Sequence, residues 1–180
     1  KWQSFTGNVL SVGYGLSETS PAAAIDPIGV SEFSDTLGLP LPSTEISIQD
    51  DNGNYLNFNE PGEICIRGPQ VMKGYWNNVE ETKRVMTEDG WFKTGDIGIM
   101  NKEGYPKIVD RKKDMIIVSG FNVYPNEIEE IAMMHEKIFE AGCIGFQNSE
   151  GDENIKLFIS TVPGEFLSIE EVIEHCKKNL

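Results

Sequence analysis

The sequence has few cysteines and no long apolar segment, and each shortage excludes a class of protein. Its three cysteines are odd in number and show no CxxC spacing: Cys65, Cys143 and Cys176. This pattern predicts free thiols in a reducing compartment rather than a disulfide framework or a metal site. No apolar run approaches the roughly 20 residues that a membrane-spanning helix needs. We therefore expect neither a disulfide-stabilised domain nor a membrane-spanning helix.

Basic residues are also scarce. The chain has 15 Lys and Arg against 29 Asp and Glu, which gives a formal net charge of −14. Non-specific nucleic-acid binding needs clustered basic residues that displace phosphate counterions. We therefore expect no nucleic-acid partner. The acidity does not say which anions are substrates, because a local basic site can lie on an acidic surface.

The chain of 180 residues is long enough for one domain or two small ones with a buried core. It begins at Lys1 within an amphiphilic stretch and ends at Leu180 within a pattern typical of a helix. We therefore expect that the sequence is a fragment of a longer protein.

A glycine-rich turn with an acidic end, GYGLSET, occupies residues 13–19. The glycines on both sides of Tyr14 permit backbone angles that other residues avoid, and they let the main chain approach a ligand closely. A tight turn without a ligand is the alternative interpretation.

A second stretch, residues 89–129, combines two further features. Asp96 lies in a Thr-Gly-Asp-Ile-Gly turn between a segment with a tryptophan and an apolar strand. Five consecutive charged residues, 110–114, then separate two apolar runs. Such a block is usually a solvated turn when it stands alone.

The hydrophobic pattern predicts an α+β fold with antiparallel sheets. Alternating apolar residues and an Asp-Asn-Gly turn signal predict strands within 39–68, and Ser168 with Glu171 predicts a capping box. The full set of expected elements is a strand at 9–12, a helix at 79–86, a hairpin around 101–104, a strand at 115–118, a helix from 125, strands at 140–146 and 155–162, and a helix after 168. We expect both of the last two helices to pack on a sheet.

These motifs together resemble the adenylate-forming superfamily of acyl-CoA synthetases, luciferases and peptide-synthetase adenylation domains. DGWFKTGDIG followed by GYPKIVDRKK is similar to long-chain fatty acyl-CoA synthetases, and VDRKKDMIIVSGFNVYPNEIE is similar to the bacterial enzymes in particular. The resemblance implies that residues 1–111 end a large AMP-binding domain with a β-barrel-like antiparallel subdomain. Residues 112–180 would form most of a small mobile α+β domain with an antiparallel sheet and packed helices.

The resemblance also implies an activity for the intact protein. A fatty acid would react with ATP to give an acyl-adenylate, and CoA would then form the thioester, with release of AMP and pyrophosphate. Mg²⁺ would be the cofactor. The expected location is cytoplasmic. Peripheral association with the inner face of the membrane and formation of a homodimer are both left open. Two alternatives remain: a related ligase for aryl or medium-chain acids, and a non-catalytic nucleotide-binding module. The isolated chain is expected to be inactive, because the phosphate loop and the catalytic lysine of the family would lie outside it.

The resemblance assigns roles to individual positions. Asp96 would accept hydrogen bonds from both ribose hydroxyls, since a carboxylate offers two acceptor oxygens. Arg111 would hold the ribose and phosphate, and its rigid fork suits oxygen recognition. Glu18 would be the catalytic carboxylate that binds Mg²⁺, an ion that prefers few carboxylates together with waters and phosphates. The other nucleotide-binding positions would be Gly13, Tyr14, Gly15 and Ser17.

The same resemblance places the hinge between the two domains at Lys113, which is also counted among the catalytic residues. In one of two domain orientations, the loop of Ser119, Gly120 and Phe121 would lie against the channel for the CoA thiol arm. A small residue in this loop would leave room for that arm.

Overall fold

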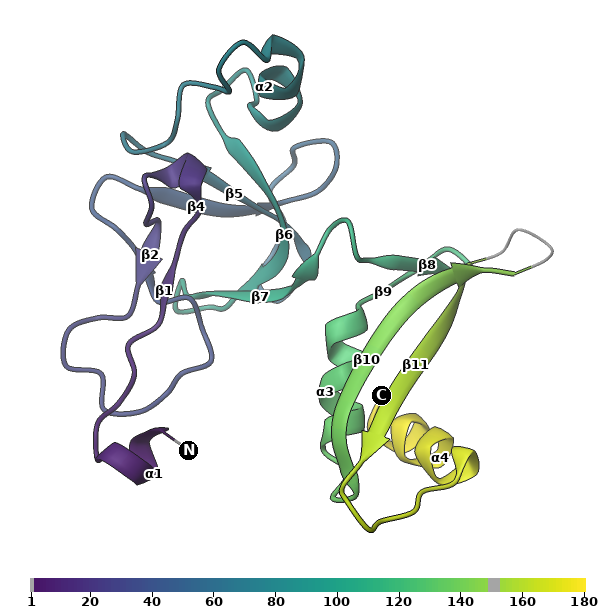
Figure 1. Ribbon diagram of the computed structural model, residues 1–180. Helices are drawn as coiled ribbons and strands as arrows, with labels where there is room; N and C mark the ends of the chain where they lie inside the picture. The colour runs from purple at the N-terminus through teal and green to yellow at the C-terminus, as the bar shows by residue number, and fades with distance from the viewer. Residues whose placement is uncertain (1, 149–152) are drawn as a thin grey trace. The chain divides into compact units, whose positions relative to one another are not determined.

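In the computed structural model, which describes residues 2–148 and 153–180, the chain divides into two units, Lys1–Ile108 and Val109–Leu180 (Figure 1). Both units combine antiparallel strands with a few helices, which confirms the predicted α+β class. The division falls slightly before the boundary expected after residue 111. The assignment of the units to the end of a large domain and a mobile small domain stays a prediction.

Two sheets build the first unit. A three-stranded sheet contains β1 (Gly13–Tyr14), β2 (Ala24–Ile25) and β3 (Leu39–Pro40). A four-stranded sheet has the order β4 (Glu45–Gln49), β5 (Gly62–Arg67), β6 (Phe92–Met100) and β7 (Pro106–Arg111), and the last three residues of β7 are counted with the second unit. The helices are α1 (Trp2–Thr6), the 3₁₀ helix η1 (Ser17–Thr19) and α2 (Val79–Val85). The predicted helix at 79–86 and the predicted hairpin around 101–104 are thereby confirmed.

One hydrophobic core joins the two sheets of the first unit. Ile48, Ile64 and Ile66 from the larger sheet pack with Tyr14 and Ala24 from the smaller one. Ile64 and Ile66 are fully buried, but Glu63 and Cys65 are buried as well, so β5 is buried on both faces and not on the single face that an alternating pattern predicts. The core therefore fixes the glycine turn relative to the larger sheet.

The predicted strand at 9–12 is wrong, because the pairing begins only at Gly13. Val12, directly before it, pairs with Asp26 through a side chain and a backbone group: the Val12 N–H donates to Oδ2 of the buried Asp26 at 2.6 Å. The Asp26 N–H donates in return to the Val12 carbonyl. The Asp26 carboxylate thus accepts the hydrogen bond that a backbone carbonyl accepts in a regular strand pair. Leu10, within the expected strand, is half-exposed.

The Asp-Asn-Gly signal does form a turn, but the next strand, β5, does not begin directly after it. Asp50 Oδ1 accepts hydrogen bonds from the N–H groups of Asn52 and Asn54, and Gly53 adopts a φ of 83°. A second turn follows, in which Glu60 accepts from Asn57, before β5 starts at Gly62.

The second unit contains a short hairpin, a helix, a long hairpin and a final helix (Figure 1). Its elements are β8 (Ile116–Val118), β9 (Phe121–Val123), α3 (Pro125–Met133), β10 (Ile138–Gln147), β11 (Glu153–Thr161) and α4 (Ile169–Asn179). Ile116, Ile128 and Cys143 form its buried core. The expected strands and helices of this region are confirmed, as is the capping box of Ser168 and Glu171.

Helix α4 differs from the expectation that both helices pack on a sheet. Helix α3 packs against β10, but α4 packs mainly against α3. His175 Nε2 lies 2.8 Å from the Ile131 carbonyl, and the rings of His135 and His175 meet edge to face. Of the apolar residues of α4, Val172 is buried and Ile173 is exposed.

The charge block at 110–114 is not wholly a solvated turn, because Asp110 is 3% exposed. Its Oδ1 accepts from the Arg111 N–H at 2.7 Å, and its Oδ2 accepts from the Asn126 N–H at 3.0 Å. Asn126 lies in the first turn of α3, whose N-cap residue Tyr124 provides no side-chain cap. Asp110 therefore supplies the acceptor and the negative charge that a helix N-terminus favours.

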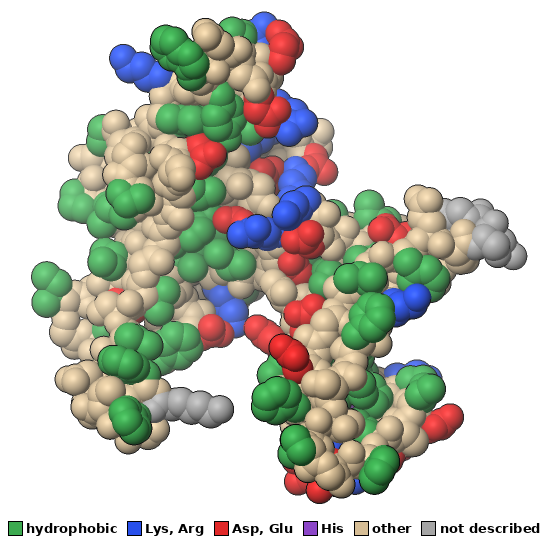
Figure 2. Space-filling view, in the orientation of Figure 1, with side chains coloured by type: hydrophobic (Ala, Val, Ile, Leu, Met, Phe, Trp, Pro, Cys, Tyr) green, Lys and Arg blue, Asp and Glu red, His purple; other side chains and the backbone are tan. Residues whose placement is uncertain are grey.

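Thiols and surface side chains complete the description. Cys65 and Cys143 are buried free thiols, and burial raises the pKa of the Cys143 thiol to about 11. Exposed hydrophobic side chains occur on both units (Figure 2), among them Phe5, Trp76 and Phe158. In the described residues, no helix has the length and apolar character to cross a membrane.

We predict that Ile64→Ala lowers the free energy of unfolding of the first unit by about 2–5 kcal/mol, since it leaves a cavity in a core shared by two sheets. Ile28→Ala, at a fully exposed position, should change it by no more than about 0.5 kcal/mol. Urea unfolding followed by tryptophan fluorescence measures this, because Trp2, Trp76 and Trp91 all lie in the first unit. Equal effects of the two substitutions would contradict the described core.

We predict that Asp110→Ala destabilises the start of α3 by about 1–2 kcal/mol, because two backbone N–H groups lose their acceptor. Asp114→Ala, in the same charge block, removes an exposed carboxylate and should have little effect. Native-state hydrogen exchange of the Asn126 amide measures the difference. Unchanged protection of that amide in the Asp110 variant would show that the cap contributes nothing.

Candidate functional site

A hydrogen bond joins the glycine turn to the Thr-Gly-Asp turn. Tyr14 Oη donates to Asp96 Oδ2 at 2.6 Å, although the two residues are 82 positions apart in the sequence. Tyr14 is 9% exposed, and its ring packs in the core of the first unit. The two motifs singled out in the sequence thus meet in space, and the carboxylate of Asp96 is held by a rigid side chain.

A β-bulge sets the direction of Asp96. The register of β5 against β6 shifts between Glu63 and Cys65, and Gly95 on β6 adopts a φ of 76°. The buried Glu63 accepts a hydrogen bond from the Gly95 N–H at 3.0 Å. Thr94 Oγ1 donates to the Ile64 carbonyl and accepts from the Asp96 N–H. A bulge re-aims the side chain that follows it, and here that side chain is Asp96.

Glu18 lies in η1, directly after the glycine turn. Its Oε1 accepts a hydrogen bond from Tyr75 Oη at 2.8 Å, and its carbonyl accepts from the Met72 N–H. Burial, and then the neighbouring Glu18, raise the pKa of Tyr75 to about 12. The buried Thr19 fixes the turn itself, since its Oγ1 accepts from the Leu16 N–H and donates to nearby carbonyls.

The two glycines of the turn have different reasons to be glycine. A Cβ at Gly15 would lie 1.8 Å from the Pro21 carbonyl oxygen, so the chain's own backbone occupies the space. A Cβ at Gly13 would meet only ordinary contacts, 3.8 Å from the Ala24 oxygen. The tight-turn interpretation therefore accounts for Gly15, whereas no contact within the described part of the chain requires glycine at position 13. Ser17 is exposed in η1.

The remaining predicted residues belong to the second unit. The side chains of Arg111 and Lys113 are exposed, and Lys113 lines a cavity of about 300 Å³ together with residues around Ile116, Cys143 and Glu153.

The loop predicted for the CoA channel is a tight hairpin turn between β8 and β9. Ser119 and Gly120 both have positive φ values, 52° and 84°, and Val118 pairs with Phe121. Two central residues with positive φ are typical of the type I′ turn that joins antiparallel strands. The turn leaves Phe121 75% exposed. Backbone conformation alone therefore accounts for the glycine at position 120.

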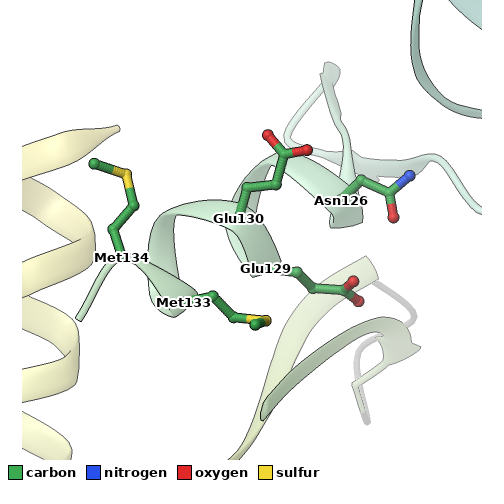
Figure 3. Close-up of a pocket in the computed structure, with 5 residues that line it drawn as sticks. All are labelled: Asn126, Glu129, Glu130, Met133 and Met134. Carbon is green, nitrogen blue, oxygen red and sulfur yellow. The ribbon is translucent and has the colours of Figure 1, made fainter. Parts of the chain in front are cut away.

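A larger cavity, of about 430 Å³, contains none of the predicted site residues. Five residues of α3 and its end line it: Asn126, Glu129, Glu130, Met133 and Met134 (Figure 3). One of its carboxylates already has a structural role, because Glu129 Oε1 accepts from the Cys143 N–H at 2.6 Å. This cavity belongs to the second unit, whereas the Tyr14 and Asp96 contact belongs to the first.

The residues available for a metal ion are few. Among the residues that the structure describes, no three His, Cys, Asp or Glu side chains gather into a metal cluster. Mg²⁺ needs no such cage, because it usually binds one or two carboxylates and otherwise waters and phosphate oxygens. Glu18, half-buried and oriented by Tyr75, fits this requirement.

Sequence reasoning missed Glu63, Thr94 and Tyr75. Thr94 and Gly95 stand in the quoted turn, so their positions next to Asp96 were a usable signal. Tyr75 is 57 residues from Glu18, and no local pattern connects the two. Its role is visible only in the folded chain.

Comparisons with known proteins agree with the resemblance of the motifs. Residues 1–76 match the family described as AMP-binding enzyme. The chain is 47% identical over 180 residues to a long-chain-fatty-acid–CoA ligase of Yersinia pestis, covering 100% of this chain and 32% of that protein. It is 38% identical over 167 residues to a probable 4-coumarate–CoA ligase 2 of Dictyostelium discoideum, covering 92% of this chain and 30% of that protein.

A solved structure shows the same fold. The crystal structure of ATP bound MatB from Rhodopseudomonas palustris matches with a TM-score of 0.92 and 31% identity, over 99% of this chain and 36% of that one. The chain thus spans about a third of the length of the proteins it matches. Residues 1–76 thus match the AMP-binding enzyme family, and the whole chain is similar to the long-chain-fatty-acid–CoA ligases.

Proposed function

We propose that this chain is part of a long-chain-fatty-acid–CoA ligase. Such an enzyme first joins a fatty acid to the AMP part of ATP and releases pyrophosphate. The CoA thiol then attacks the acyl-adenylate and releases AMP. The observation that carries the proposal is the hydrogen bond between Tyr14 and Asp96, because it joins the two motifs that would bind the nucleotide.

The first unit would bind the nucleoside. The bulge at Gly95 and the bond from Tyr14 fix the carboxylate of Asp96, which would accept hydrogen bonds from the ribose hydroxyls. Tyr14 would contribute its ring to the adenine side of the site, and Gly13 would let the nucleotide approach the backbone. A pre-fixed carboxylate supports this role, because a ligand held in one orientation reacts more readily than a mobile one.

Glu18 would hold Mg²⁺, and Ser17 would contact the phosphates. When bound, the ion neutralises negative charge on the reacting phosphate oxygens. Glu18 fits because one of its oxygens is already oriented by Tyr75. In the adenylation step the fatty carboxylate is the nucleophile that attacks the α-phosphorus, so repulsion between these two negatively charged groups is part of the barrier that an ion held by Glu18 would lower.

The second unit would serve the thioester step. Arg111 would bind ribose and phosphate oxygens, Lys113 would be the hinge, and the turn at Ser119 and Gly120 would present Phe121 to the CoA channel. The exposure of Phe121 and of both basic side chains supports these roles, since each needs access to a substrate or to a moving domain.

The partners of the intact enzyme would be ATP, a fatty acid and CoA. We place it in the cytoplasm and peripherally at the inner face of the membrane, because its substrate partitions into lipid. A homodimer stays a prediction without a supporting contact.

A second candidate is a ligase for aryl acids, favoured by the likeness to the 4-coumarate–CoA ligase. The adenylation chemistry and the roles of Asp96 and Glu18 would be the same. The higher identity to the Yersinia pestis protein, and its coverage of the whole chain, favour the fatty acid.

We predict that Asp96→Asn lowers kcat/KM for ATP in the intact enzyme by about 10- to 100-fold, because each hydrogen bond to a charged group contributes about 1.5–3 kcal/mol. Asp89→Asn, at an exposed turn, is the matched control. Fatty-acid-dependent exchange of pyrophosphate into ATP measures adenylation directly.

The same assay with 2′,3′-dideoxy-ATP makes the test specific for the ribose. The unsubstituted enzyme should strongly prefer ATP, and Asp96→Ala should lose most of that preference. An Asp96 variant that retains the full preference for ATP would contradict the assigned role.

A further inference from the structure

We infer that Tyr75 is a positioning residue for the metal-binding carboxylate of Glu18. The inference rests on the proposed function, because it concerns the binding of a divalent cation with ATP. It adds a residue that neither the motifs nor the comparisons identify.

Two contacts from one short segment fix Glu18. Tyr75 Oη donates to Glu18 Oε1 at 2.8 Å, and the Met72 N–H donates to the Glu18 carbonyl at 2.8 Å. The segment thus holds both the backbone and the side chain of the same residue. The bond from Met72 to the Glu18 carbonyl would be enough to hold the two backbone segments together. The bond from Tyr75 acts in addition on the Glu18 carboxylate.

The carboxylate has an oxygen left for a ligand. Within residues 2–148 and 153–180, the Tyr75 bond is the one side-chain hydrogen bond that Glu18 makes. A hydroxyl that orients one oxygen and leaves the other towards the ligand is a common arrangement behind metal-binding carboxylates. Mg²⁺ suits such a site, because it takes one carboxylate oxygen and completes its shell with water and phosphate.

Helix α2 holds Tyr75 in place. The Tyr75 N–H donates to Thr82 Oγ1 at 2.9 Å, and this hydroxyl in turn donates to the Asn78 carbonyl. Gly74 has a φ of 150°, and a Cβ there would lie 2.6 Å from a methyl carbon of Thr82. The glycine therefore allows the close approach, and a continuous set of contacts leads from α2 through Tyr75 to Glu18.

Tyr75→Phe tests the inference, because it keeps the ring and removes only the hydroxyl. In the intact enzyme, Mn²⁺ serves as the probe, and its dissociation constant with bound α,β-methylene-ATP is measured by electron paramagnetic resonance. We expect the Mn²⁺ dissociation constant to rise about 10-fold, the lower end of what loss of such a partner causes. The affinity for metal-free nucleotide should stay unchanged.

Three further variants separate the loss of the Tyr75 contact from a general effect on the fold. Tyr105→Phe removes a hydroxyl for which no hydrogen bond is found among the described residues, and it should leave Mn²⁺ binding unchanged. Thr82→Val removes the support of Tyr75 and should weaken Mn²⁺ binding, whereas Thr82→Ser retains the hydroxyl and should restore it.

The outcomes separate this inference from the proposed function. If the unsubstituted enzyme exchanges pyrophosphate and binds Mn²⁺ with the nucleotide, but Tyr75→Phe binds Mn²⁺ equally well or more tightly, the inference is overturned and the proposed function stands. If the unsubstituted enzyme neither exchanges pyrophosphate nor binds Mn²⁺ with the nucleotide, both are overturned.

Discussion

The hydrogen bond between Tyr14 and Asp96 is the constraint on which the candidate site depends. Tyr14 belongs to the hydrophobic core that joins the two sheets of the first unit, and its hydroxyl reaches a carboxylate on β6. The position of that carboxylate is therefore set by core packing rather than by a mobile surface loop. Glu18 lies four residues after Tyr14, in the short turn that Thr19 closes. The packing of Tyr14 in the core therefore also fixes the position of Glu18. Stability and site geometry are coupled in this unit, because the same ring serves both.

Buried carboxylates have a second, structural use in this acidic chain. Asp26, Glu63 and Asp110 each accept a hydrogen bond from a backbone N–H at a point where the chain leaves regular pairing. A buried N–H without an acceptor costs free energy. By accepting these hydrogen bonds, the three carboxylates stabilise the irregular backbone. Glu63 stabilises the bulge that aims Asp96, and Asp110 caps the helix that follows the proposed hinge. The side chains that define the backbone of the site are thus not the ones that would touch the nucleotide.

The sequence predicted the elements whose signals are local. The capping box at Ser168, the turn at Asn52 and Gly53, and the strand around Ile64 and Ile66 depend on neighbouring residues, and all appear in the structure. The strand expected before Gly13 did not form, because a side chain of Asp26 replaced its partner. The packing of α4 on α3 and the bond from Tyr75 to Glu18 were also missed. Each depends on residues far apart in the sequence, and no periodic pattern reports such contacts. The motif residues of the candidate site could be proposed from the sequence, but the side chains that position them could not.

The most direct measurement of the central claim is acyl-CoA formation by the intact enzyme with ATP, Mg²⁺, CoA and a series of acids. The series contains saturated fatty acids of increasing chain length and 4-coumarate as the aryl acid. We predict turnover that is highest with long chains, with release of AMP and pyrophosphate. Turnover confined to 4-coumarate or short acids would retain the adenylation chemistry and contradict the substrate. The absence of turnover with every acid would contradict the claim that this chain belongs to an acid-activating ligase.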